Sequence, residues 1–272
     1  MLIASIIFAI LVICTPVLFR ELRLNKLSSE EKVAQIKKTV VFDHITKLET
    51  VGHYNVYYTQ TEDSYLLIEG GIKEITALKL CYSNGELRLT LTNKRRKPKI
   101  HVSVFSPGLF GIKVSGGGTF TIKGDFISTA RVNFTINGGK AFIDKIVCKD
   151  FVGDLIGGAT AIIKSIECNT LCYRAVGSGI SALNAIKIKQ NADFISTGSG
   201  GIIFGKLYTM GSIRIKKVGS GTIMIAYGEC SALKIDILGR GLVTGVMKYN
   251  TIQTSPSGQY SINNVILSKP HS

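Results

Sequence analysis

Residues 197–225 read "TGSGGIIFGKLYTMGSIRIKKVGSGTIMI", in which a Gly-Ser-Gly turn returns after 21 residues and introduces a second short apolar run. Related glycine-rich turns recur at steps of 20 or 21 residues through the second half of the chain. They begin at Gly116, Asn137, Gly157, Gly177, Gly198, Gly219 and Gly239. Seven copies at a nearly constant period predict a repeat architecture.

The runs between the turns identify the type of repeat. They are short, apolar and rich in β-branched residues, as in "TFTI", "TAII" and "TIMI", and they lack a helical period. A unit of about twenty residues with two or three such strands and no helix forms one coil of a parallel β-solenoid. The sequence therefore predicts an all-β fold, with about seven coils of 20–21 residues and a C-terminal closing segment over residues 106–272.

We interpret the glycine-rich turns as corners of the coil. Glycine adopts a positive φ without a Cβ clash, and Asn137 is expected to do the same because asparagine tolerates the left-handed region. A phosphate-binding loop would occur once and begin a helix. These turns occur seven times and begin strands, so the pattern favours a structural role.

Strand alternation assigns the two faces of each coil. Side chains four and six residues after the start of a turn are predicted to point inward, and the side chain at the fifth residue outward. The outward position holds an apolar stripe, which we define as Phe142, Ile162, Ile203 and Met224. An exposed stripe would bind a lipid or a lipopolysaccharide-like amphiphile; alternatively, another segment or another chain covers it. A cationic border is expected from Lys123, Lys164 and Lys206.

The N-terminal residues 1–19 carry no charged side chain. As a helix they would extend about 28 Å, enough to cross a bilayer core of about 30 Å. We predict an uncleaved membrane anchor, with a cleaved export signal as the alternative. Residues 20–38 are predicted to form a charged helical spacer, since Ser28 and Glu31 have the spacing of a capping box. The basic residues after the apolar stretch favour a cytoplasmic location for that side, which conflicts with export.

Residues 39–105 lack the repeat and are predicted to form an antiparallel β cap over the first coil, with a hairpin at Asn84-Gly85. The cap contains the sequence "NKRRKPK" at 93–99. Its residues Lys94, Arg95, Arg96 and Lys97 form a candidate anion-binding loop, with a merely solvated loop as the alternative. The chain's formal net charge of +15 also favours anionic partners such as lipid head groups or acidic glycans. Nucleic acid is disfavoured, because no aromatic residues that could stack on bases are interleaved with the loop.

The sequence has no pattern that predicts catalysis, a cofactor or a metal site. None of the four histidines lies in the repeats, and no two of them have a metal-ligand spacing. Cys148, Cys168 and Cys230 each lie eleven residues after the start of a turn, so they share one column of the solenoid. We interpret them as buried free thiols. A Cys148–Cys168 disulfide between neighbouring coils is the alternative.

The segment "VVFDHITKLETVGHYNVYYTQ" at 40–60, the strand "NGELRLTL" at 84–91 and the Gly-Ser-Gly coils together resemble the head GIN domain family of bacterial auto-transporter adhesins. The resemblance covers residues 39 to about 262. It implies a β-solenoid with a β cap and export from the cytoplasm, and it offers no catalytic residues. His44 departs from the family, which often has a turn glycine at this position, and the strongly basic balance is not implied by the resemblance.

These features favour a non-enzymatic binding or adhesion module of the cell envelope, at the periplasm or the cell surface, with an anionic glycan or a lipid as its ligand. In this hypothesis residues 1–19 hold the protein at the membrane. The alternative is a structural scaffold that self-associates as a homo-oligomer. A third hypothesis, an enzyme acting on polysaccharides, is supported only by the fold analogy to other β-helices.

Overall fold

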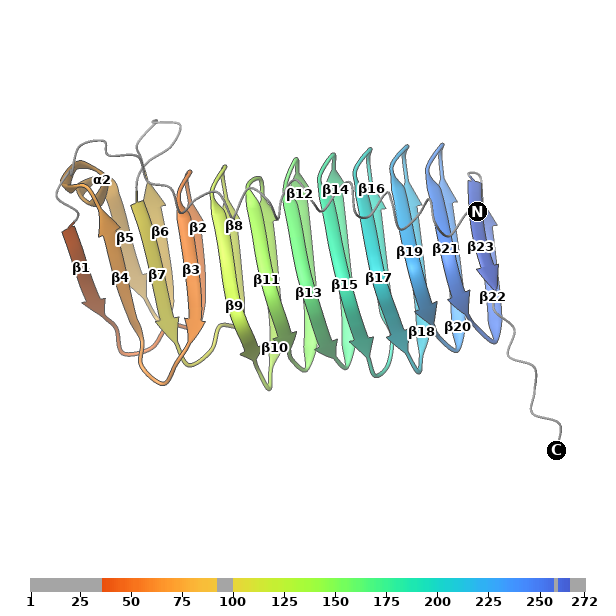
Figure 1. The fold of residues 1–272 in the computed structure, drawn as a ribbon, viewed down its shortest axis with the longest axis horizontal. Helices are drawn as coiled ribbons and strands as arrows, with labels where there is room; N and C mark the ends of the chain where they lie inside the picture. The colour runs from red at the N-terminus through yellow and green to blue at the C-terminus, as the bar shows by residue number, and fades with distance from the viewer. Residues whose placement is uncertain (1–35, 92–99, 257–258, 265–272) are drawn as a thin grey trace, which may run out of the picture. The chain divides into compact units, whose positions relative to one another are not determined.

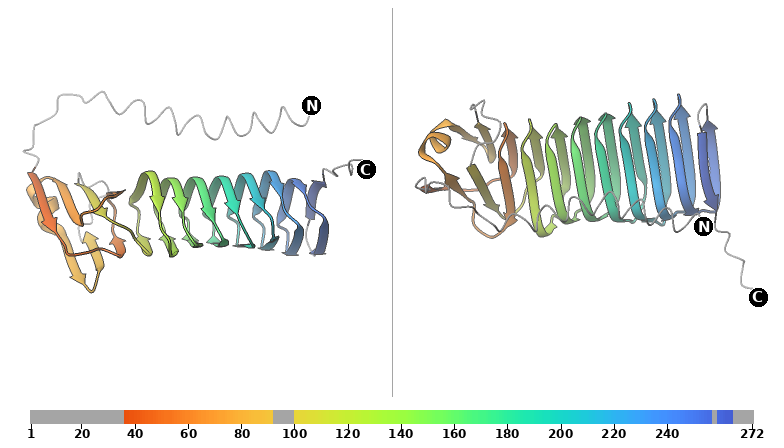
Figure 2. Two further views of the ribbon diagram at one scale, coloured as in Figure 1. Left: turned by 90° about the horizontal axis from the view of Figure 1, so that it is seen from below. Right: turned by 45° about the horizontal axis from the view of Figure 1, so that its top comes forward.

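The computed structural model describes residues 36–91, 100–256 and 259–264. These residues form two sheets that lie face to face, and successive coils stack along one axis (Figures 1 and 2). Each coil contributes one strand to each sheet, and strands of neighbouring coils pair in parallel and in register. The predicted parallel β-solenoid is confirmed.

Sheet A has twelve strands. In spatial order they are β1 (Ile36–Val41), β4 (Tyr65–Gly70), β7 (Ile100–Ser106), β3 (Asn55–Gln60), β9 (Thr119–Ile127), β11 (Lys140–Val147), β13 (Thr160–Cys168), β15 (Ile180–Ile188), β17 (Gly201–Thr209), β19 (Thr222–Glu229), β21 (Leu242–Lys248) and β23 (Gln259–Asn264).

Sheet B has eleven strands. In spatial order they are β22 (Thr251–Pro256), β20 (Ala232–Leu238), β18 (Ser212–Val218), β16 (Ala192–Thr197), β14 (Thr170–Gly177), β12 (Asp150–Gly157), β10 (Arg131–Asn137), β8 (Gly111–Ser115), β2 (Lys47–Val51), β6 (Glu86–Leu91) and β5 (Leu78–Ser83). A short helix, α2 (Ile72–Ala77), connects β4 to β5.

The core lies between the two sheets and is built from alternate side chains of every strand. The predicted inward positions of the first six coils are buried, from Phe120 and Ile122 to Ile223 and Ile225. Aromatic rings from both sheets meet inside, and Phe194 of sheet B lies 4.5 Å from Phe204 of sheet A between ring centroids. Stacking therefore buries apolar faces that a single coil would leave exposed.

The cap contains the predicted antiparallel ladders, β1 with β4, β4 with β7 and β5 with β6. It also contains parallel pairs, because β2 pairs with β8 and β3 pairs with β9. Gly52, between β2 and β3, has φ +129°, and its backbone lies directly against the corner residue Gly116. Thus β2 and β3 form an additional rung of the solenoid inside the predicted cap.

At both ends of the described chain the strands extend beyond the segment boundaries predicted from the sequence. Residues 36–38, assigned to the helical spacer, belong to strand β1. At the other end, β22 and β23 pair in parallel with β20 and β21, so residues 251–256 and 259–264 continue the coil. The anchor at 1–19, the rest of the spacer and the basic loop at 93–99 lie outside the described residues. Within the described ranges, no helix has the length and apolar character needed to span a membrane.

Six of the seven predicted corner residues have positive φ, from +74° at Gly157 to +115° at Gly177. The prediction for Asn137 is wrong. Asn137 completes the ladder of β10, opposite Ser115 and Ile156, and the positive φ values fall on Gly138 and Gly139. The second coil therefore turns one residue later than the sequence alignment of the turns suggests.

A lysine supports the corners from inside the core. Lys217 occupies an inward position of β18 and is fully buried, beside the buried Ser196 of the neighbouring strand. Its Nζ donates hydrogen bonds to the carbonyl oxygens of Gly198 at 2.9 Å and Val218 at 3.2 Å. Burial lowers the pKa of the Lys217 ammonium. This side chain connects the core to the backbone of two successive glycine corners.

Candidate binding surfaces

The parallel register brings the apolar stripe together. Phe142 pairs with Ile162, and Ile203 pairs with Met224, while Ala182 lies between the two pairs. The five side chains form one straight column on the outer face of sheet A and are half-buried. The stripe is thus neither core nor fully exposed.

A second set of apolar side chains lies beside the glycine corner. Ile156 and Val176 directly precede the glycines that end β12 and β14, and Leu238 ends β20. The three side chains are 39%, 46% and 52% exposed. Ile180 begins β15 on the other side of the corner and is 54% exposed. We call these four residues and the apolar stripe the apolar band, because they flank the same corner on both sheets. Ile156 and Val176 are neighbours in the register of sheet B, and Thr197 and Val218 lie between Val176 and Leu238. Exposed apolar side chains grouped on one face are typical of an interface.

Sequence reasoning missed the four corner residues. For Ile156, Val176 and Leu238 the signal was present, because the residue directly before the turn glycine is apolar, as it also is at Val218. Alternation along β12, β14 and β20 places these three residues at outward positions, directly after the buried Leu155, Ala175 and Ile237.

The predicted cationic border is a row of mixed charge. Lys164 Nζ lies 2.7 Å from Asp144 Oδ1, and this contact, with a hydrogen bond from the Gly124 amide, lowers the pKa of Asp144. Lys145 contacts both Asp125 at 3.5 Å and Glu167 at 3.6 Å. Lys123 and Lys206 are exposed. The band is therefore bordered by ion pairs as well as by lysines.

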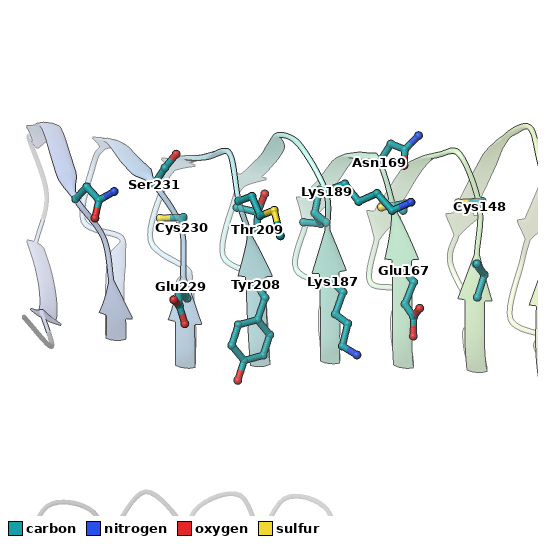
Figure 3. A pocket seen from close by; sticks show the side chains of 15 residues that line it. Cys148, Glu167, Asn169, Lys187, Lys189, Tyr208, Thr209, Glu229, Cys230 and Ser231 are labelled. Atoms are coloured by element: carbon teal, nitrogen blue, oxygen red, sulfur yellow. The ribbon is translucent and has the colours of Figure 1, made fainter. Parts of the chain in front are cut away.

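At the opposite corner each coil passes from sheet A to sheet B, and we call this the second corner. A groove with a volume of about 740 Å³ follows it. Its floor contains Cys148, Cys168, Ile188, Thr209 and Cys230. Figure 3 shows Glu167, Lys187, Tyr208 and Glu229 in a row along the strand ends, and Asn169 and Ser231 on the side of the corner. Residues about twenty apart in sequence thus contribute equivalent positions to one continuous groove.

The thiols in the floor are free, as predicted. Burial, together with the charge of Asp150, raises the pKa of Cys148 to about 12. Burial is also the main cause that raises the pKa of Cys168 to about 12 and the pKa of Cys230 to about 11. A thiolate is the reactive form of cysteine, so these groups are unreactive and apolar at neutral pH. Among the described residues, no cluster of His, Cys, Asp and Glu could hold a metal ion.

We expect the three floor thiols to resist alkylation in the folded protein. At pH 8 a group with a raised pKa stays protonated, and reactivity should increase only as the pH approaches 11 to 12. Iodoacetamide followed by peptide mass spectrometry measures the modified fraction at each site. Exposed Cys81 is the internal control and should react readily. Equal labelling of Cys81 and Cys168 in the folded protein would contradict the burial of the groove floor.

The spacing of the groove carboxylates bears on catalysis. Glu167 and Glu229 lie on β13 and β19, three rungs apart, which is about 14 Å at the spacing of paired strands. Glycosidases place their two carboxyl groups about 5 to 9.5 Å apart. These two residues therefore lack the arrangement that hydrolyses a glycosidic bond.

The two-sheet solenoid with its β cap is the fold of a recognised group of bacterial proteins. The family described as "Putative auto-transporter adhesin, head GIN domain" matches residues 44–264. The chain belongs to this family. The matched residues include the glycine corners, the apolar band and the groove. No curated protein sequence matches the chain.

Solved structures share the fold of this head GIN domain protein. A putative adhesin from Parabacteroides merdae superposes with a TM-score of 0.70 at 17% identity, covering 85% of this chain and 96% of its own. A putative adhesin from Bacteroides fragilis has a TM-score of 0.60 at 18% identity, with 88% and 98% covered. A protein from Parabacteroides distasonis named a putative lipid binding protein has a TM-score of 0.60 at 19% identity, with 85% and 97% covered. At these identities the likeness shows the fold.

Proposed function

We propose that this head GIN domain protein is a non-enzymatic binding module of the cell envelope that attaches to anionic lipid or lipid-like amphiphiles. The observation that carries the proposal is the apolar band, with its four side chains that are 39% to 54% exposed at the glycine corner. Water is excluded from such side chains when the corner enters the boundary between head groups and acyl chains. The naming of one structural neighbour as a putative lipid binding protein supports the same ligand class.

The charges favour an anionic surface. The net charge of +15 attracts anionic head groups at long range. Exposed Lys140 and Arg240 lie in or next to the glycine corners, beside the band. Aliphatic side chains would contact acyl chains while these cations contact the head groups. The small Gly and Ser residues of the corner keep the approach of the backbone unobstructed.

The test removes the exposed apolar side chains without changing strand propensity. In the triple variant Val176→Thr, Ile180→Thr and Leu238→Thr, we expect binding to weaken at least tenfold. Full-length protein in phosphatidylcholine nanodiscs is mixed with vesicles of equal parts phosphatidylglycerol and phosphatidylcholine, and co-flotation is measured. Melting temperature should change by only a few degrees, because the three positions are exposed.

A matched control removes exposed apolar side chains away from the band. Ile72→Thr with Ile127→Thr should leave vesicle binding unchanged, although these residues are 63% and 53% exposed. Equal vesicle binding by the parent and the band variant would overturn the proposal. If the parent is a homo-oligomer and the band variant is a monomer with unchanged vesicle binding, the band is an interface between copies, and the scaffold hypothesis replaces the lipid hypothesis.

A further inference from the structure

The groove at the second corner is separate from the apolar band. The two surfaces lie at opposite ends of the sheet A strands, which for the eight residues of β11 is about 26 Å. We propose that this groove binds one linear, β-linked glycan chain that carries N-acetyl groups and little net charge. This site and ligand class go beyond the lipid surface proposed above.

The shape of the groove requires an elongated ligand. It follows the column from Cys148 to Cys230, four rungs apart, or about 19 Å. The groove repeats similar positions on every rung, at a step of about 4.8 Å. One pyranose ring in an extended β-1,4-linked chain advances by nearly the same distance. Neighbouring sugars of such a chain are turned by about half a turn relative to each other, so every second sugar would meet every second rung in equivalent surroundings.

The wall of the groove suits hydroxyl and amide groups. One row of side chains offers both kinds of hydrogen-bonding group. Glu167 and Glu229 can accept hydrogen bonds, Lys187 can donate them, and Tyr208 can do both. With Lys189 on the other wall, two carboxylates and two ammonium groups line the groove, so their charges cancel. A polyanion would meet as many repulsive as attractive charges here, despite the net charge of the whole chain.

The floor favours N-acetyl groups over simple hydroxyls. Three neutral thiols and Ile188 form an apolar surface that offers contacts to methyl groups. The side-chain amides of Asn169 and Asn250 lie at the edge of the groove and can pair with acetamido groups. Tyr208 provides an aromatic face, and its ring lies 5.8 Å from that of Tyr227 between centroids. The groove thus alternates apolar and polar contacts, as an N-acetylated sugar chain does.

The experiment measures binding of chitohexaose, the β-1,4-linked hexamer of N-acetylglucosamine, to the full-length chain in nanodiscs by isothermal titration calorimetry. We expect chitohexaose to bind at least tenfold more tightly than cellohexaose, which has the same linkage without acetamido groups. Polygalacturonate should bind more weakly than chitohexaose. No binding of chitohexaose, or tighter binding of polygalacturonate, would overturn the inference.

Variants locate the site. Tyr208→Ala should weaken chitohexaose binding at least tenfold, and Lys187→Glu, which leaves the floor intact, should weaken it severalfold. Tyr57→Ala is the matched control, since Tyr57 is also a half-buried tyrosine on sheet A but lies outside the groove. Unchanged binding in both groove variants would place the glycan elsewhere and refute the inference. The Val176→Thr, Ile180→Thr and Leu238→Thr variant should bind chitohexaose normally. The chitohexaose and vesicle experiments therefore test the two proposals independently.

Discussion

Replacing Gly198 and Gly219 together with valine is expected to destabilise the protein by about 4 kcal/mol or more and to lower the melting temperature by about 10 °C. Both residues have positive φ, +106° and +98°, which a β-branched residue strongly disfavours. A Cβ on Gly198 would lie 2.5 Å from the carbonyl oxygen of Gly177, and one on Gly219 would lie 2.8 Å from that of Gly198. Each clash falls on backbone that holds the neighbouring corner, so relaxation is difficult. Circular dichroism melts measure the change.

Ser199→Val is the control for this variant. Ser199 lies between the glycines of the same corner, is exposed, and does not have positive φ. We expect a change of less than about 1 kcal/mol there, because surface substitutions away from special backbone positions have small effects. Equal melting temperatures for the parent and the double variant would show that the corners tolerate side chains and that stacking does not require glycine.

Tyr173→Ala is expected to lower the free energy of unfolding by about 4 kcal/mol, in the upper part of the range for large-to-small core substitutions. Tyr173 is fully buried on β14, and its hydroxyl lies 2.7 Å from the hydroxyl of Ser181. The neighbouring inward position on β12 is Gly153, where a Cβ would lie 2.5 Å from the tyrosine ring. The ring thus occupies the volume of two side chains. Without it, two adjacent rungs would share one large cavity.

Tyr173→Phe separates the ring from the hydroxyl. This variant keeps the packing but leaves the Ser181 hydroxyl buried without its partner, and we expect a loss of about 1 to 2 kcal/mol. Tyr260→Ala provides a matched control, because Tyr260 is 44% exposed on the last rung. Chemical denaturation of the three variants gives the free energies of unfolding. Equal effects of the Ala and Phe variants would contradict the packing role of the ring.

The solenoid can present two different surfaces because its coils repeat. A residue type that recurs every 20 or 21 residues becomes a column along the axis, and each column lies on a fixed face of the body. Outward apolar residues on both sides of the glycine corner produce the apolar band. Polar residues over buried thiols at the second corner produce the groove. Lipid attachment and glycan binding could thus be combined on one rigid body without any moving part.

The sequence by itself determined the period, the parallel stacking, the inward positions and most of the corners. These features depend on local physics, namely strand alternation and the positive φ that glycine allows, and the chain repeats them in every coil. Phe142, Ile162, Ile203 and Met224 were placed in one column by counting alone, and the register confirms that arrangement. The same counting failed at Asn137, where one corner is a residue shorter and the turn begins at Gly138.

Only the tertiary structure decided which outward residues are exposed and where a cavity forms. Ile156 and Val176 are exposed at the outward position directly before a corner glycine, whereas the outward stripe residues are half-buried. The groove requires side chains from four or more coils. In the cap, β2 and β3 each form a parallel ladder with a strand more than sixty residues away in sequence, β8 and β9 respectively. The groove and the parallel pairing in the cap are set by contacts between residues distant in sequence, which a local pattern does not reveal.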